Sequence, residues 1–165
     1  MAASRQSRIL EAGAIAPDFQ LQDLRGRAYK LRDLTAAGPA VLAFFKTTCP
    51  VCQLTFPFLE RIHRGQAEPK VAIYGVSQDD PESTTDYNQE LGVTFPTLLD
   101  TADSGYPASN AYQISHVPTA FLVEPDGRIA WTMEGFDKKA LEALAARAGV
   151  TVFLATDNVP AFKAG

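Results

Sequence analysis

The sequence has few of the residues that usually hold small secreted or metal-binding proteins together. It contains 2 cysteines and 2 histidines in 165 residues, and Cys52 follows closely after Cys49. Such a close pair cannot supply a framework of disulfides. Two sulfurs alone cannot complete a tetrahedral zinc site, and His63 and His116 stand apart from any cluster with ligand spacing. The cysteines therefore predict chemistry rather than structural support.

Clusters of basic residues and long apolar runs are also missing. The chain carries 15 basic and 19 acidic residues, a net charge of -4, without the Lys/Arg cluster that would bind a phosphate backbone or an anionic membrane. We expect neither nucleic acid nor a membrane as a partner. Residues 1–13 include Arg5 and Arg8 but no apolar run as long as a signal-peptide core or a membrane span. We expect a cytoplasmic protein, unless an export signal has been removed.

What the sequence does contain is enough apolar residues, 46% of the total, for one well-packed domain. We expect a polar leader over residues 1–12, a single domain over residues 13–149 and a tail over residues 150–165. The tail could dock on the domain, cover a groove of a neighbouring molecule or hang free. Its apolar residues include Val152, Phe153, Leu154 and Phe162.

The two cysteines fall at a junction between two patterns. Residues 40–45 form a continuous apolar run, typical of a strand buried on both faces. From Pro50 to about Arg64 apolar residues recur at intervals of three and four, which predicts an amphipathic helix. Cys49 and Cys52 therefore lie where a central strand turns into a helix.

The remaining pattern alternates strands with helices. We expect a hairpin of strands at 19–23 and 28–31, helices at 80–91, 109–112 and 137–149, and strands at 71–76, 97–99, 119–123 and 128–131. This order predicts an α/β fold with a mixed sheet flanked by helices on both faces.

The start of a helix favours a reactive sulfur. Unpaired N–H groups and the positive end of the helix dipole stabilise a thiolate at Cys49. Pro50 suits the first turn because its missing N–H is not needed there. Cys52 lies about one turn further along the same face, within reach of an intramolecular disulfide. Cys49 is thus the expected nucleophile and Cys52 the resolving thiol, against the alternative of two inert buried thiols.

These residues resemble the thioredoxin-like superfamily, and within it the TlpA-type and AhpC/TSA-related branch, over about residues 13–149. The C-P-V-C motif at 49–52 followed by Pro57 is similar to the C-x-x-C-x-x-x-x-P of thioredoxins. The G-A-I-A-P-D-F stretch at 13–19 is similar to the opening of that branch. A strand–helix unit inserted between Cys52 and Pro118 also matches it.

The resemblance implies roles for further residues. Val117, Pro118 and Thr119 look like the cis-proline loop that aligns a substrate strand beside the sulfur. The buried acid of thioredoxins, a proton acceptor for the resolving cysteine, is replaced by Ala43. Asp79, after the next strand, looks like the acid that takes this role in the TlpA-like branch, although it could simply belong to a helix cap.

The resulting prediction is a thiol-disulfide oxidoreductase without an organic cofactor or metal. Its partners would be protein or small-molecule disulfides and thiols, and a recycling thiol reductant. Two alternatives stay open. A thiol peroxidase is disfavoured because Lys46 and Leu42 stand where peroxiredoxins carry Thr or Ser and Pro, but Thr47 and Thr48 lie close. A copper-binding or redox-sensing module would use the same cysteines, with His116 as a further ligand.

Overall fold

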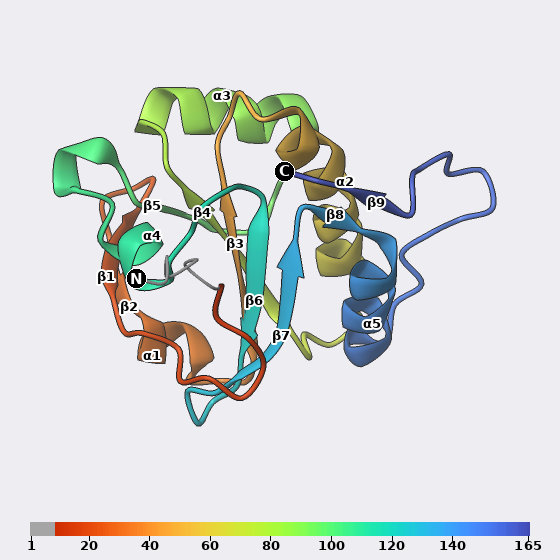
Figure 1. Cartoon of the computed structure of the whole chain (residues 1–165), viewed down its shortest axis with the longest axis horizontal. Helices are drawn as coiled ribbons and strands as arrows, with labels where there is room; N and C mark the ends of the chain where they lie inside the picture. Colours follow the sequence, from red (N-terminus) through yellow and green to blue (C-terminus); the bar gives the residue numbers. More distant parts are fainter. Residues whose placement is uncertain (1–8) are drawn as a thin grey trace, which may run out of the picture.

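A computed structural model describes residues 9–165 as one seven-stranded sheet, with helices around it and a separate two-stranded ribbon (Figure 1). Arg5, Arg8 and most of the expected leader lie outside the described residues. The order in the large sheet is β2-β1-β5-β4-β3-β6-β7. The strands are β1 (Gln20–Asp23), β2 (Ala28–Lys30), β3 (Ala40–Phe45), β4 (Ala72–Ser77), β5 (Thr97–Leu99), β6 (Thr119–Val123), β7 (Ile129–Glu134), β8 (Phe136–Asp137) and β9 (Phe162–Lys163).

The centre of the sheet is the continuous apolar run, as expected. All six residues of β3 are buried, and β3 pairs in parallel with β4 and antiparallel with β6. Successive side chains of a strand point to opposite faces. Phe45 therefore packs on Phe56 at 4.5 Å between ring centroids, whereas Phe44 packs on Tyr112, on the other face, at 5.4 Å.

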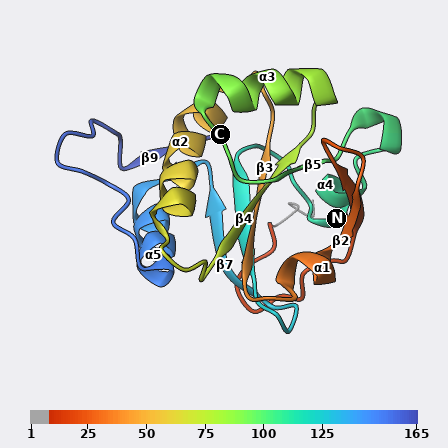
Figure 2. The same ribbon diagram turned by 180° about the vertical axis from the view of Figure 1, so that it is seen from behind.

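Helices cover both faces, which confirms the expected fold class. The α-helices are α1 (Leu31–Thr35), α2 (Pro50–Gly65), α3 (Pro81–Leu91), α4 (Pro107–Ala111) and α5 (Lys138–Ala148), and Ala102–Ser104 forms a 3₁₀ turn. Helices α2 and α5 lie side by side in both views (Figures 1 and 2). Among the described residues, no helix is long and apolar enough to cross a bilayer.

The expected caps form where the sequence places them. Asp80 caps α3 by accepting a hydrogen bond from the Ser83 N–H at 2.8 Å, and Asp137 caps α5 through the Ala140 N–H at 3.1 Å. Helix α5 ends at Gly149 in the left-handed conformation, φ 73°. Local capping signals of this kind are readable from sequence because both partners are near neighbours.

Two local expectations were wrong. The strand expected to reach Leu31 ends at Lys30, and α1 begins at Leu31 because the Asp33 carboxylate accepts the Lys30 N–H at 2.7 Å. The strand expected at 128–131 runs to Glu134, because β6 offers it a partner as far as Thr119. For the tail three alternatives were left open, and in the structure it docks on the domain, where it forms β9 against β8.

Candidate active site: a dithiol at the start of α2

Cys49 is the N-cap residue of α2, directly after the turn that follows β3. Its backbone is extended, with φ -84° and ψ 115°, and its half-buried side chain lies at the surface of the core. The Cys49 Sγ accepts a hydrogen bond from the Cys52 N–H at 3.2 Å. The sulfur thus occupies the place of a capping oxygen, where a backbone N–H and the positive helix end can both stabilise negative charge.

Cys52 lies one turn further along α2 and is 0% exposed. Burial, with a hydrogen bond to Cys49 as the next cause, raises the pKa of the Cys52 thiol far above its ordinary value. Cys52 therefore remains protonated near neutral pH. The two cysteines differ sharply in access, because the side chain of Cys49 is partly exposed whereas that of Cys52 is fully buried.

This difference predicts selective alkylation of the reduced protein. Iodoacetamide at pH 7 is expected to modify Cys49 at least about ten times faster than Cys52, because thiolate character and exposure set the rate. Mass spectrometry of peptides from the timed reaction measures both rates. Urea-unfolded protein is the control and should label both cysteines at similar rates. Equal labelling in the folded protein would show that burial does not protect Cys52.

The Val117–Pro118 peptide bond is cis, as the sequence resemblance implied. Strand β6 begins at Thr119, beside Phe44 on β3, so the loop before it faces the end of β3 where α2 starts. The Cys49 thiol lies 3.5 Å from the Val117 carbonyl oxygen. Thr119 Oγ1 donates to the His116 carbonyl at 2.9 Å and ties the loop together. Tertiary structure thus brings together the predicted residues from positions 49–52 and 117–119.

Asp79 reaches the same site from the end of β4. Its Oδ2 accepts hydrogen bonds from the Thr47 N–H at 2.6 Å and the Thr47 hydroxyl at 2.9 Å. Gln53 in turn donates to the Thr47 carbonyl at 3.0 Å. Asp79 therefore holds the turn that carries Cys49. Thr47, which lies close to the position where peroxiredoxins carry a Thr or Ser, has its hydroxyl committed to this carboxylate.

Tyr87 is a neighbour of the dithiol that the sequence did not single out. It lies on α3, 4% exposed, stacked on Phe45 at 4.8 Å between ring centroids. Its hydroxyl has no hydrogen-bond partner among residues 9–165. Burial, then the charges of Cys52 and Cys49, raises the pKa of Tyr87. The sequence offers only a weak signal for this position of Tyr87, because a tyrosine on the inner face of a helix is usually only a packing residue.

The positions of His116 and the other potential ligands offer little support for the metal-binding alternative. His116 has its Nδ1 3.1 Å from Ser115 Oγ and its Nε2 3.4 Å from a Glu134 carboxylate oxygen. Within the part of the chain that the structure describes, no three His, Cys, Asp or Glu residues gather as a metal ion would require.

The structure combines three features: a mixed sheet, a pair of cysteines at the start of the helix that follows the central strand, and a cis-proline loop beside the sulfur of Cys49. Together they define a thioredoxin-like protein with a redox-active site. The chain belongs to the AhpC/TSA family, whose model matches residues 12–132. It is 31% identical to the thiol-disulfide oxidoreductase ResA of Geobacillus thermodenitrificans over 124 residues, which cover 74% of this chain and 69% of that protein.

Solved structures show the same fold. The thioredoxin domain of a thiol-disulfide oxidoreductase from Bacteroides vulgatus matches with a TM-score of 0.73 at 24% identity, over 84% of this chain and 97% of that one. The peroxidoxin BcpB of Mycobacterium tuberculosis matches with a TM-score of 0.70 at 20% identity, over 85% and 97%. Proteins named for two different chemistries share this architecture, so the residues at the site must decide the reaction.

Proposed function

We propose that this protein exchanges thiols and disulfides, with Cys49 as the nucleophile and Cys52 as the resolving thiol. The observation that carries the proposal is the asymmetry of the pair. The Cys49 sulfur is partly exposed and accepts the Cys52 N–H, whereas Cys52 is fully buried within the same helical turn. This arrangement presents one sulfur to a substrate and keeps the second in reserve behind it.

The exchange takes two displacements. The Cys49 thiolate attacks one sulfur of the substrate disulfide, a new S–S bond forms, and the other substrate sulfur leaves with the electron pair of the broken bond. Cys52 then loses its proton and attacks the Cys49 sulfur, which releases the second substrate thiolate and leaves a Cys49–Cys52 disulfide. Two electrons have moved to the substrate, and an external dithiol returns them. The Val117, Pro118 and Thr119 backbone, beside Cys49, would position the partner.

The proposal is tested by reduction of insulin disulfides with dithiothreitol as the electron source. We expect turnover well above the rate with dithiothreitol alone. Protein whose Cys49 has been blocked with iodoacetamide is the matched control and should give only the background rate. If the unblocked protein is no faster than background, it is not a general disulfide reductase, and peroxide consumption and Cu(I) binding become the next measurements.

We further propose that Asp79 accepts the proton that Cys52 gives up. A buried thiol with a raised pKa needs a base before it can attack, and Asp79 is held at the turn before Cys49. Asp79→Asn keeps an oxygen for Thr47 but removes the base, so the resolving step is expected to slow by about 10²-fold or more. Single-turnover decay of a preformed Cys49 mixed disulfide measures that step as a function of pH.

Asp80→Asn provides the control for that prediction. Asp80 is adjacent in sequence but caps α3 through Ser83, a role that asparagine fills equally well. It should leave the resolving rate unchanged. Equal rates for Asp79→Asn and the native protein would mean that the proton leaves by another route.

The cytoplasmic location and a role in antioxidant defence or redox homeostasis stay predictions. The physiological role depends on the direction of exchange, which the reduction potential of the Cys49–Cys52 pair sets. Potentials of proteins with such a pair range from roughly -270 mV for thioredoxin to roughly -120 mV for a strong oxidant. Equilibration against a glutathione buffer, with thiols counted by mass, gives the value, and a high potential would argue for an oxidant outside the cytoplasm.

A further inference from the structure

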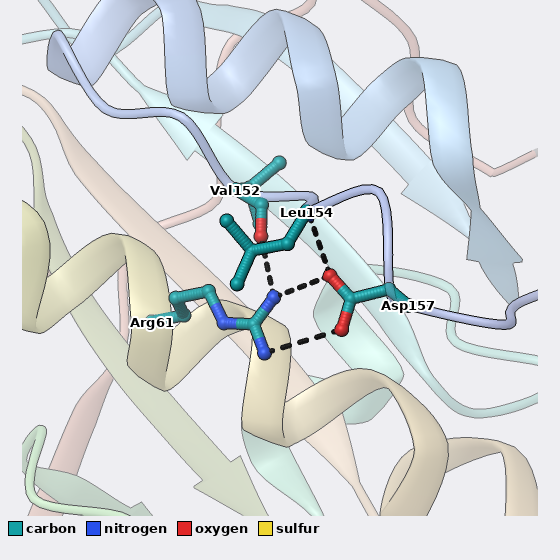
Figure 3. A network of polar contacts seen from close by, with 4 residues as sticks. All are labelled: Arg61, Val152, Leu154 and Asp157. Atoms are coloured by element: carbon teal, nitrogen blue, oxygen red, sulfur yellow. Dashed lines mark hydrogen bonds and ion pairs between the residues drawn. The ribbon is translucent and has the colours of Figure 1, made fainter.

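The tail, residues 150–165, leaves α5 and is anchored on α2. Val152 is buried, and the ring of Phe153 packs against that of Phe58 at 4.9 Å. Figure 3 shows Arg61 donating to the Val152 carbonyl at 2.8 Å and to Asp157 Oδ2 at 2.7 Å. The same carboxylate oxygen accepts the Leu154 N–H at 2.7 Å. These contacts fix the first half of the tail on the helix that begins with the dithiol.

The second half of the tail pairs with β8 in the two-stranded ribbon and runs toward the active site. Phe162 and Lys163 form β9, antiparallel to β8, and the Lys138 N–H donates to the Ala161 carbonyl at 2.9 Å. In both views the described chain finishes beside the first turn of α2 (Figures 1 and 2). The tail thus reaches the helix end that carries Cys49.

The Val117 carbonyl is where the tail and the nucleophile meet. A Cβ placed on Gly165 would collide with this carbonyl and lie 3.2 Å from Pro118 Cδ. The Cys49 thiol approaches the same carbonyl oxygen at 3.5 Å. A polypeptide that brings a disulfide to Cys49 along this loop would therefore meet the backbone of residues 164–165.

Gly135 makes room for this path. Its φ is 64°, and its N–H donates to the Pro118 carbonyl at 2.8 Å. A Cβ at Gly135 would collide with the Lys163 carbonyl and lie 3.1 Å from the Gly165 nitrogen. The tail, the β7–β8 turn and the cis-proline loop therefore come together at a residue that has no side chain.

A surface hollow of about 380 Å³ remains between the tail and the loop, lined by His116, Glu134, Gly135, Phe162, Ala164 and Gly165. Cys49 does not line this hollow, but its own side chain stays partly exposed beside the tail. A small disulfide therefore has access that an extended chain lacks.

We propose that residues 161–165 cover the side of the active site along which a polypeptide substrate would lie. While the tail is in place, the enzyme therefore prefers small disulfides to polypeptide disulfides, and this preference ends when the tail is displaced. This inference rests on the proposed exchange function. A tethered segment competes at an effective concentration in the millimolar range, which an incoming polypeptide must overcome. The edge of β8 that β9 occupies is likewise closed to strand addition by a substrate.

The test compares the full chain with a chain that stops after Pro160. Residues 161–165 are exposed, so their removal takes nothing from the core. If the tail is seated about nine-tenths of the time, the truncation should raise kcat/KM for insulin about ten-fold. The rate with the small disulfide 5,5′-dithiobis(2-nitrobenzoate) should change by less than about two-fold, because that reagent does not need the covered edge.

A second readout does not depend on turnover. Alkylation of Cys49 by a bromoacetyl decapeptide should accelerate on truncation, whereas alkylation by iodoacetamide should not. The role of the tail would be overturned if truncation changed neither the ratio of the rates with insulin and the small disulfide nor the ratio of the two alkylation rates. If both chains reduce no disulfide but the two alkylation rates still diverge, the exchange function is wrong and the covering of Cys49 stands.

A point substitution provides an independent check. Gly135→Ala should push the Lys163 carbonyl away and shift selectivity in the same direction as truncation. Gly127→Ala is the matched control, because Gly127 also has a positive φ, 88°, but open space where the Cβ would go. Gly127→Ala should lose stability for the same reason, an alanine at positive φ, but should leave the ratio of the rates with polypeptide and small disulfides unchanged. A change in that ratio as large as the one caused by Gly135→Ala would overturn the proposal.

Discussion

Replacing Cys49 by serine is expected to reduce insulin turnover to the uncatalysed rate, a loss on the order of 10³-fold or more, as for removal of other covalent nucleophiles. A serine hydroxyl neither ionises near neutral pH nor forms a disulfide. Cys52 cannot take over, because it is 0% exposed and its pKa is raised by burial. Dithiothreitol-driven insulin reduction measures the loss directly.

Serine also makes this variant a clean comparison. Its oxygen can accept the Cys52 N–H that Cys49 Sγ accepts now, and serine is among the preferred N-cap residues. The midpoint of thermal unfolding should therefore stay close to that of the native protein when both are reduced. Retention of substantial turnover by a folded Cys49→Ser variant would mean that the nucleophile has been misassigned.

Replacing Cys52 by serine is expected to trap the mixed disulfide between Cys49 and the substrate, an intermediate that Cys49→Ser cannot form. Cys49 still attacks, but no second thiol lies within the helical turn to resolve the mixed disulfide. The variant should accumulate one covalent substrate adduct per chain, with turnover limited to the slow release of that adduct by dithiothreitol. Non-reducing electrophoresis and intact mass spectrometry measure the adduct.

The double variant Cys49→Ser, Cys52→Ser is the control for trapping and should form no adduct. The adduct in the single variant should map to Cys49 alone. Full turnover by Cys52→Ser without a trapped species would show that an external thiol, rather than Cys52, normally resolves the intermediate. That outcome would point to a one-cysteine mechanism such as peroxide reduction.

Several parts of the site were predictable because their signals are local. The six buried residues of β3, the helix that follows them and the C-P-V-C junction all lie within one stretch of chain. Asp80 and Asp137 cap helices through partners three residues away. The cis bond before Pro118 followed from resemblance rather than from any local rule, because most X-Pro bonds are trans.

Other parts depended on contacts between distant segments. Asp79 was predicted from the resemblance to the TlpA-like branch, but its bonds to Thr47 connect residues far apart in sequence. Tyr87 resembles an ordinary core residue until α3 is packed against β3 and α2. The tail has no periodicity, because its position is held by scattered contacts with Arg61, Phe58 and β8 rather than by a repeating pattern.

The sequence by itself predicted where the two cysteines lie, at a strand-to-helix junction, and what kind of sheet carries them, because strand burial, helix periodicity and capping are encoded over a few neighbouring residues. Only the tertiary structure decided what surrounds Cys49. The cis-proline loop, the Asp79 carboxylate and residues 164–165 come from positions that are distant in the chain and meet only once the sheet has ordered its strands and α2 has packed on it.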